Sequence, residues 1–226
     1  MDRIQTHFSK TVKDYDTIAE KVVFKNDELH NELVNAICLD KNKRLKVLDL
    51  GCGTGHGMSL MAQKFPNSRI TGIDFSPKMI EKSKINLAKY SDRIELIEMD
   101  FRNYHFNQKF DAVVSAIAIH NIQDEEKSEL FERIYDSLDI GGQLINADFY
   151  KHEFYSIDDQ LRMIYKNFLE KNLEGEELNT WLMHAFEEDM PMTLASQSNL
   201  LANIGFSNFK LLWMFNNEAI YSAMKS

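Results

Sequence analysis

Short apolar runs alternate with amphipathic stretches through the middle of the chain, a pattern typical of α/β folds with a parallel sheet. The apolar runs predict strands over residues 45–50, 69–73, 94–99, 110–118 and 143–148. The amphipathic stretches predict helices over residues 58–65, 78–90 and 125–138. The fourth run is almost continuously apolar, as expected for a strand buried on both faces of its sheet. Gly141 and Gly142 are expected to turn the chain before the last of these strands.

The segments on either side of this alternating core have a different pattern. Apolar positions in residues 1–44 recur at helical spacing, which predicts a helical cap. Residues 150–190 predict long helices rich in charged and aromatic side chains, too large for an ordinary connection. Two β segments, 209–215 and 219–224, flank an Asn-Asn turn and predict a hairpin. We therefore expect a single domain with a cap (1–44), a core (45–149), a helical lid insert (150–195) and a closing hairpin (196–226).

The loop after the first predicted strand is rich in glycine. Gly51, Gly53 and Gly55 follow the strand in a G-x-G-x-G arrangement, and Asp49 lies two residues before the first of them. A second acid, Asp74, ends the next strand, where a carboxylate can accept hydrogen bonds from both hydroxyls of a ribose. The dinucleotide fingerprint G-x-G-x-x-G does not fit, because its third glycine position is occupied by another residue in either register. These features indicate an adenosine-containing ligand that lacks a pyrophosphate.

The strand, glycine loop, helix and acid together resemble the class I methyltransferases that depend on S-adenosylmethionine (SAM), of the type that acts on small molecules. The resemblance covers residues 45–150 and the hairpin. It implies a doubly wound, mostly parallel seven-stranded sheet whose last strand is antiparallel. It also implies SAM as cofactor, S-adenosylhomocysteine as product and methyl transfer to a small-molecule acceptor.

The resemblance further implies a set of cofactor-binding residues along the carboxyl ends of the strands. They are Asp49, Gly51, Cys52, Gly53, Thr54, Gly55, Asp74, Phe75, Met79, Asp100, Phe101, Ser115, Ala116 and His120. Phe75 and Met79 would flank the adenine, and Asp100 with Phe101 would meet its amino group and ring face. The ligand role is preferred for both acids, and the alternatives are a turn cap for Asp100 and a helix cap for Asp74. Cys52 is expected to serve as a small residue in a tight loop rather than as a nucleophile.

Two residues are candidates for a catalytic role. Methyl transfer is an in-line displacement, so aligning the reactants supplies much of the acceleration, and a base is needed only for an acceptor that must lose a proton. His120 follows the fourth strand, and its ordinary pKa near 6.5 suits proton acceptance. Tyr15 lies in a segment similar to the cap of small-molecule methyltransferases. Packing is an open alternative for both side chains.

An acceptor pocket is expected between the core and the insert. Its candidate lining residues are Tyr150, His152, Tyr155, Arg162, Trp181 and His184, although residues of these types are more often core or surface. Asp148 has the better placement, because open α/β sheets bind ligands at the carboxyl ends of their strands.

Composition and charge limit the classes of partner and ligand that this protein is expected to bind. The net charge is −9, and no stripe of basic residues is present to neutralise phosphates, which argues against bulk nucleic acid. No apolar run reaches 18 residues and the N-terminus is polar, so we expect no membrane association and a cytoplasmic location. The two cysteines and the histidine spacing predict no metal site. A compact, partly apolar or cationic small-molecule acceptor fits best, and a homodimer is compatible with the sequence.

Three other functions are compatible with these motifs. A carboxy-SAM synthase shares the arrangement, although no site for a carboxylate donor can be assigned. A non-catalytic SAM-binding partner or sensor would bind the ligand without turnover and expose apolar surface on its lid. An NAD-dependent oxidoreductase conflicts with the glycine spacing.

Overall fold

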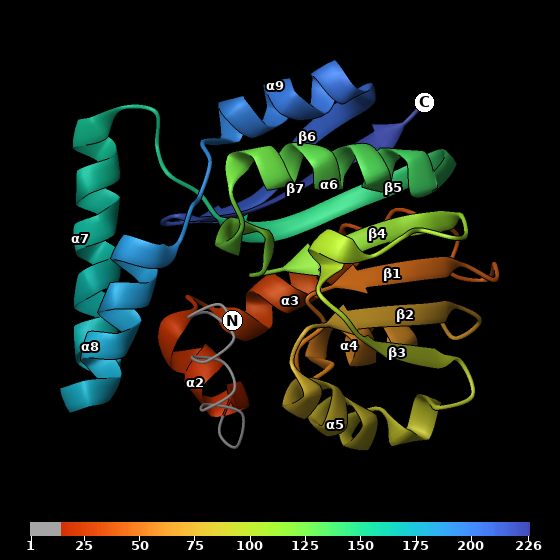
Figure 1. Ribbon diagram of the computed structural model, residues 1–226, viewed down its shortest axis with the longest axis horizontal. Coiled ribbons are helices and arrows are strands. Elements are labelled where there is room, and N and C mark those ends of the chain that lie inside the picture. Colours follow the sequence, from red (N-terminus) through yellow and green to blue (C-terminus); the bar gives the residue numbers. More distant parts are fainter. Residues whose placement is uncertain (1–14) are drawn as a thin grey trace.

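The computed structural model describes the backbone of residues 15–226, in which seven strands form one sheet (Figure 1). The strands are β1 (Lys46–Leu50), β2 (Arg69–Asp74), β3 (Ile94–Glu98), β4 (Phe110–Ala116), β5 (Leu138–Phe149), β6 (Phe206–Phe215) and β7 (Glu218–Lys225). Their order is β3-β2-β1-β4-β5-β7-β6. The first five strands are parallel, and β7 pairs antiparallel with both neighbours. This arrangement confirms the predicted fold class.

The fifth strand is longer than predicted. We expected Gly141 and Gly142 to turn the chain, but β5 begins at Leu138 and runs through both glycines. Gly141 takes a positive φ of 80°, and the register with β4 shifts between Phe110 and Ala112. The glycines therefore bend the strand at an irregularity in the ladder instead of ending it.

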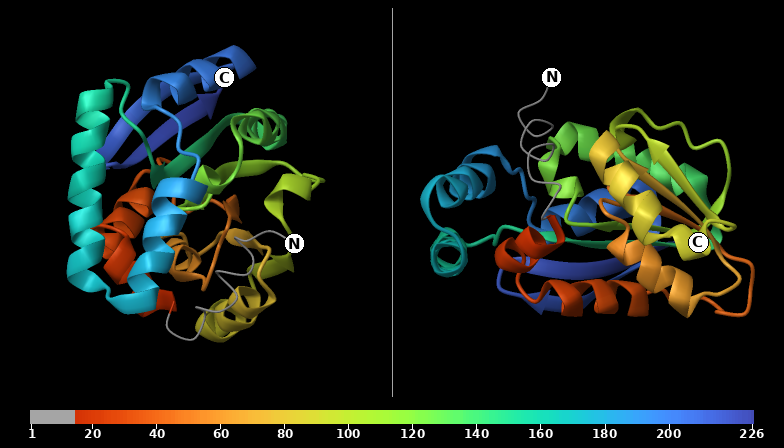
Figure 2. Two further views of the ribbon diagram at one scale, coloured as in Figure 1. Left: turned by 60° about the vertical axis from the view of Figure 1, so that its left-hand side comes forward. Right: turned by 90° about the horizontal axis from the view of Figure 1, so that it is seen from below.

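Helices cover both faces of the sheet. One face carries α3 (Asn26–Asn35), α4 (His56–Lys64) and α5 (Pro77–Asn86). The other carries α6 (Asp124–Ser137) and α9 (Leu194–Ile204), and the sequence analysis had assigned no helix where α9 lies. Short 3-10 turns occur at Ala88–Tyr90, Phe101–Asn103 and Ile119–Asn121. The right-hand view of Figure 2 shows the two helical layers with the sheet between them.

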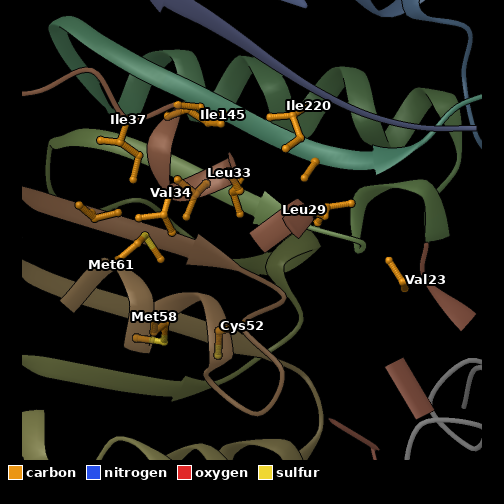
Figure 3. Close-up of a cluster of buried hydrophobic side chains, with 14 of the residues drawn as sticks. Val23, Leu29, Leu33, Val34, Ile37, Cys52, Met58, Met61, Ile145 and Ile220 are labelled. Atoms are coloured by element: carbon orange, nitrogen blue, oxygen red, sulfur yellow. The ribbon is translucent and has the colours of Figure 1, made fainter. Parts of the chain in front are cut away.

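The core is divided between the two faces because neighbouring strand residues point in opposite directions. Val47 belongs to the cluster beneath α3 and α4, whereas Leu48 belongs to the cluster beneath α6 and α9, and both are fully buried. Figure 3 shows the first cluster, in which Leu33 of α3 and Met61 of α4 approach Ile145 of β5. The central strands are mainly apolar because both of their faces are covered.

The remaining helices lie at one end of the sheet. They are α2 (Tyr15–Val22), α7 (Tyr155–Asn172), α8 (Gly175–Met183) and a π-helix (His184–Glu188). Figures 1 and 2 show α7 and α8 side by side, with α2 next to them. The Tyr165 hydroxyl of α7 donates to the carbonyl of Val22, 2.8 Å away, and the rings of Phe24 and Phe168 lie 4.1 Å apart. The cap and the insert thus pack on each other. No helix among residues 15–226 is long and apolar enough to cross a membrane.

Candidate functional site

The loop after β1 is held in a conformation that requires glycine. Gly51, Gly53 and Gly55 all have positive φ angles, of 73°, 51° and 85°. A Cβ on Gly51 would lie 2.6 Å from the Cβ of Ala118, and one on Gly55 would lie 2.6 Å from the hydroxyl of Ser83. Any other residue at Gly51 or Gly55 would strain the backbone and displace the neighbouring side chains. The loop backbone can therefore lie close to a bound ligand.

Asp74 joins the end of β2 to this loop. One carboxylate oxygen accepts from the backbone N–H of Gly53 at 2.9 Å, and the other accepts from that of Ser76 at 2.8 Å. Burial raises the pKa of Asp74 to about 6, although both hydrogen bonds favour the charged form. Asp74 therefore orders the glycine loop and the turn before α5, whose N-cap is Ser76 and not Asp74. A carboxylate has about four acceptor positions, so both oxygens can still accept from a ribose.

A pocket opens beside the loop, and its lining is acidic. Six of the predicted cofactor residues line it: Asp49, Gly51, Cys52, Gly53, Thr54 and Ala116. Asp16, Glu20 and Asp27 add three more carboxylates from α2 and α3, whereas none of the described lining residues is Lys or Arg. The hydroxyl of Thr54 donates to Asp16 over 2.6 Å, which attaches the cap to the loop. The pocket favours a cationic ligand.

Asp49 is the most perturbed of these acids. It is 4% exposed, and burial together with the nearby Asp74 raises its pKa to about 7. No hydrogen bond to its carboxylate occurs within residues 15–226, so its charge lacks the donors that usually accompany a buried carboxylate. The thiol of neighbouring Cys52 has a pKa raised well above its ordinary value by burial and by these acids, so the thiol stays protonated. A positively charged ligand group would compensate Asp49.

The predicted adenine contacts lie around the ends of β2 and β3. Asp100 accepts from the backbone N–H and both Nε and Nη2 of Arg102, at 2.9, 2.9 and 2.6 Å, and so caps the turn over Phe101–Asn103. Phe101 is buried, and its ring lies 3.9 Å from the position of a Cβ on Gly51. Met79 is buried and Phe75 half-buried, at the start of α5. Their ligand contacts stay predictions.

Ser115 and Ala116, at the end of β4, face different surroundings. The hydroxyl of Ser115 donates to the Leu50 carbonyl over 2.9 Å, so this side chain joins β4 to β1. Ala116 lines the acidic pocket with the next residue, Ile117. Ile117 has φ +51°, an unusual value for a β-branched residue. Strain of this kind persists where the surrounding structure imposes it and is frequent at functional sites.

A second pocket lies between the sheet and the insert. Its lining residues are Ala19, Val22, Val23, Ile117, His120, Phe149, Tyr165, Trp181, His184, Ala185 and Asp189. It shares Ala19, Val23 and Ile117 with the acidic pocket, so the two are neighbours. Its composition, mainly apolar and aromatic with a few polar groups, is typical of small-molecule sites.

The residues predicted to line an acceptor pocket do not lie together: some line the second pocket, some line another hollow, and some line neither. Trp181 and His184 line the second pocket. Tyr150 and Arg162 line a different hollow, which shares Tyr165 with the second pocket. His152 and Tyr155 line neither, and Tyr155 is 83% exposed.

His120 lies in the second pocket within a network of buried carboxylates. Its Nδ1 is 2.5 Å from Asp148, which also accepts from the His120 backbone N–H at 2.9 Å, and its Nε2 is 3.6 Å from Asp189. Burial lowers the pKa of His120, but the two carboxylates outweigh this effect and raise it overall. The raised pKa means that His120 holds a proton more tightly than a free imidazole does, and its role as a general base stays a prediction.

Some pocket residues were not identified from the sequence. Asp189, Phe149 and Tyr165 approach His120 only through folding, and no local motif marks them. The other catalytic candidate, Tyr15, begins α2, but its side chain lies outside the described part of the chain, as does the segment before it.

Comparison with known proteins gives consistent results. A family model described as "Methyltransferase domain" matches residues 47–142. A malonyl-[acyl-carrier protein] O-methyltransferase of Acetivibrio thermocellus is 36% identical over 112 residues, which cover 50% of this chain and 38% of that protein. A carboxy-S-adenosyl-L-methionine synthase of Nautilia profundicola is 26% identical over 181 residues, which cover 80% of this chain and 77% of that protein. The chain thus spans well under half of the first relative's length.

Solved structures share the fold. A phosphoethanolamine N-methyltransferase of Haemonchus contortus, in complex with SAM, superposes with a TM-score of 0.69 at 17% identity, covering 96% of this chain and 60% of that one. The sequence match contains the glycine loop and Asp74, and the seven strands have the order of the same fold. Over residues 47–142 in sequence, and over the seven-stranded sheet in fold, the chain is similar to the class I, Rossmann-like SAM-dependent methyltransferases.

Proposed function

We propose that this protein binds SAM and transfers its methyl group to a small-molecule acceptor. The observation that supports this most strongly is the pair of adjoining pockets, one acidic and beside the glycine loop, the other aromatic and beneath the insert. SAM carries an ammonium and a sulfonium, and the acidic pocket supplies carboxylates without lysine or arginine among its described lining residues. In this arrangement Asp49 receives the ammonium group, and Asp74 accepts from the ribose hydroxyls.

We propose that transfer occurs at the wall that the two pockets share. Ala19, Val23 and Ile117 contribute to both linings, so the methyl group is presented at this wall and the acceptor approaches from the aromatic side. The methyl carbon forms a bond to the acceptor as its bond to sulfur breaks, and the sulfonium leaves as a neutral thioether. The protein contributes alignment and exclusion of water, since the leaving group needs no protonation. Phe149, Tyr165 and Trp181 suit an acceptor that is partly apolar.

A carboxy-SAM synthase activity is the second candidate. It is favoured because the chain aligns with such synthases over nearly the full length of both proteins. Such a synthase of Campylobacter lari is 22% identical over 213 residues, covering 93% of this chain and 89% of that protein. A carboxylate donor would require a cationic group in the acceptor pocket. The described lining of that pocket offers two histidines but no lysine or arginine. We therefore rank methyl transfer first.

The test uses methyl-labelled SAM and a cell extract separated into small-molecule and macromolecular fractions. We expect S-adenosylhomocysteine to form, and label to move into a small molecule, only when the small-molecule fraction is present. Label in the macromolecular fraction alone would contradict the small-molecule acceptor, and a carboxylated SAM without S-adenosylhomocysteine would favour the second candidate. Gly55→Ala, which disturbs the glycine loop, provides the inactive control.

A further inference from the structure

Three side chains of the second pocket form a cluster with the composition of a metal site. His120, His184 and Asp189 each offer one ligand atom, and these three atoms all lie within 4.8 Å of one another. His120 follows β4, whereas His184 and Asp189 are the first residue of the π-helix and the residue after it. Sixty-four residues separate the two histidines along the chain, so sequence spacing could not indicate the site. Our expectation of no metal rested on that spacing.

The two distances from Asp189 fit coordination better than hydrogen bonding. One oxygen of Asp189, Oδ1, lies 3.6 Å from Nε2 of His120 and 3.4 Å from Nε2 of His184. Metal–ligand bonds of about 2.0–2.2 Å in tetrahedral geometry place neighbouring ligand atoms about 3.3–3.6 Å apart. The same oxygen has no hydrogen-bond partner among the described residues, although the Asp189 side chain is only 7% exposed. A buried carboxylate oxygen without a donor points to a cation.

The other nitrogen of each histidine is already oriented by a carboxylate. Nδ1 of His120 lies 2.5 Å from Asp148, and Nδ1 of His184 lies 3.2 Å from Glu188. Histidine ligands of metals characteristically donate their second N–H to such a group, which fixes the tautomer and aims the lone pair of Nε2 at the metal. The amide of Asn121 lies 3.1 Å from Nε2 of His120, a contact that an ion would displace.

Backbone contacts hold the two halves of the cluster together. The N–H of Met190 donates to the carbonyl of His120 at 2.9 Å, and Nζ of Lys127 donates to the Met190 carbonyl. The π-helix over His184–Glu188 closes with the N–H of Asp189 donating to the His184 carbonyl, which places both side chains on the same side. Single π turns of this kind are frequent at functional sites.

We propose that His120, His184 and Asp189 bind one divalent transition-metal ion, of the zinc or iron(II) class, in the acceptor pocket. Two imidazoles and a carboxylate are the ligands that these ions accept, and three protein ligands leave a position open. The three carboxylates of Asp148, Glu188 and Asp189 balance the charge of the ion.

The role of the ion rests on the proposed function, although its binding does not. An acceptor hydroxyl at the open position would have its pKa lowered, so that its proton leaves to water. The oxygen then attacks the methyl carbon of SAM, the C–O bond forms as the C–S bond breaks, and the sulfur leaves as a thioether. The ion would lower the pKa of the acceptor in place of a general base, and it favours an acceptor that binds through oxygen.

The test is a titration of the whole, chelator-treated protein with Co²⁺, followed by its visible absorption and by tryptophan fluorescence. The ring of Trp181 lies 5.6 Å from that of His184, so an ion at the cluster should quench its emission. The chain has two tryptophans, and Trp213→Phe leaves Trp181 as the reporter. We expect one equivalent to bind, with coincident absorption and quenching, and Zn²⁺ to displace it.

Matched variants locate the site. Asp189→Asn, which keeps the shape of the side chain, should weaken Co²⁺ binding at least 100-fold, and Glu188→Gln, which acts through His184, about 10–100-fold. His105→Ala, at an exposed histidine outside the cluster, should change nothing. Absence of binding, several weak equivalents, or binding unaffected by Asp189→Asn would overturn the proposal. SAM titrations of the metal-free protein are separate, so failure of SAM binding would refute the proposed function and leave the metal site standing.

Discussion

Asp49→Asn should stabilise the protein in the absence of ligand and weaken its affinity for SAM. Burial, with Asp74 nearby, raises the pKa of Asp49 from 3.8 to about 7. An acid with a higher pKa in the folded state stabilises the protein less as the pH rises from the unfolded pKa to the folded pKa. The charge therefore destabilises the fold increasingly between about pH 4 and 7, and the full effect is present above about pH 7.

The size of this effect follows from the pKa shift. A shift of about three pKa units corresponds to about 4 kcal/mol, at about 1.4 kcal/mol per unit. The amide of Asn has the same shape, and leaving it without partners in the same site costs about 1–3 kcal/mol. Asp49→Asn should thus increase the free energy of unfolding by about 1–3 kcal/mol, which raises Tm by roughly 2–12 °C for a chain of this size.

The assay combines thermal unfolding with calorimetric SAM titration. The advantage of Asp49→Asn should decrease by about 1.4 kcal/mol for each pH unit as the pH falls from about 7 to about 4. SAM affinity at about pH 7.5 should fall about 10–100-fold, because a charge-assisted hydrogen bond is lost. Asp92→Asn, at an exposed acid, is the control that should change neither quantity. A variant less stable than the wild type, with unchanged SAM affinity, would refute the reasoning.

Three further predictions concern the glycine loop and the wall between the pockets. Asp74→Ala should weaken SAM binding by about 1–3 kcal/mol and also lower Tm, because Gly53 and Ser76 lose their acceptor; calorimetry showing full affinity would exclude the ribose role. Gly55→Ala should destabilise the chain by about 1–3 kcal/mol through its φ of 85° and the clash with Ser83, and an unchanged Tm would contradict the close approach. Ile117→Gly should relieve the backbone strain and keep SAM binding but slow methyl transfer, whereas equal losses of binding and turnover would show that Ile117 only supports the cofactor.

The core of the fold could be predicted from the sequence because its signals are local. Apolar runs such as residues 110–118 mark strands buried on both faces, and each glycine of the loop occupies a position that needs a positive φ. The extent of β5 was mispredicted, since Gly141 and Gly142 serve as a bend within a strand as readily as a turn. Helix α9 was missed because its sequence mixes apolar and small polar residues, and residues 196–226 were assigned as a whole to the closing hairpin.

The site residues could be predicted only where they belong to a local sequence motif. The glycine loop and Asp74 came from spacing along the chain, and the structure places them together beside Asp49. Asp189 could not be predicted as a site residue, because its proximity to His120 depends on how the insert folds over the ends of β4 and β5. Even Asp100, which lies at a recognisable position, has its carboxylate engaged by Arg102, a partner that spacing did not suggest.

The most direct measurement is a calorimetric titration of the whole protein with SAM, compared with NAD⁺ under the same conditions. The acidic pocket and the glycine spacing predict one SAM site per chain, weakened by Asp49→Asn, and no binding of NAD⁺. Binding of NAD⁺ without binding of SAM would contradict the assignment of this site to methyl transfer.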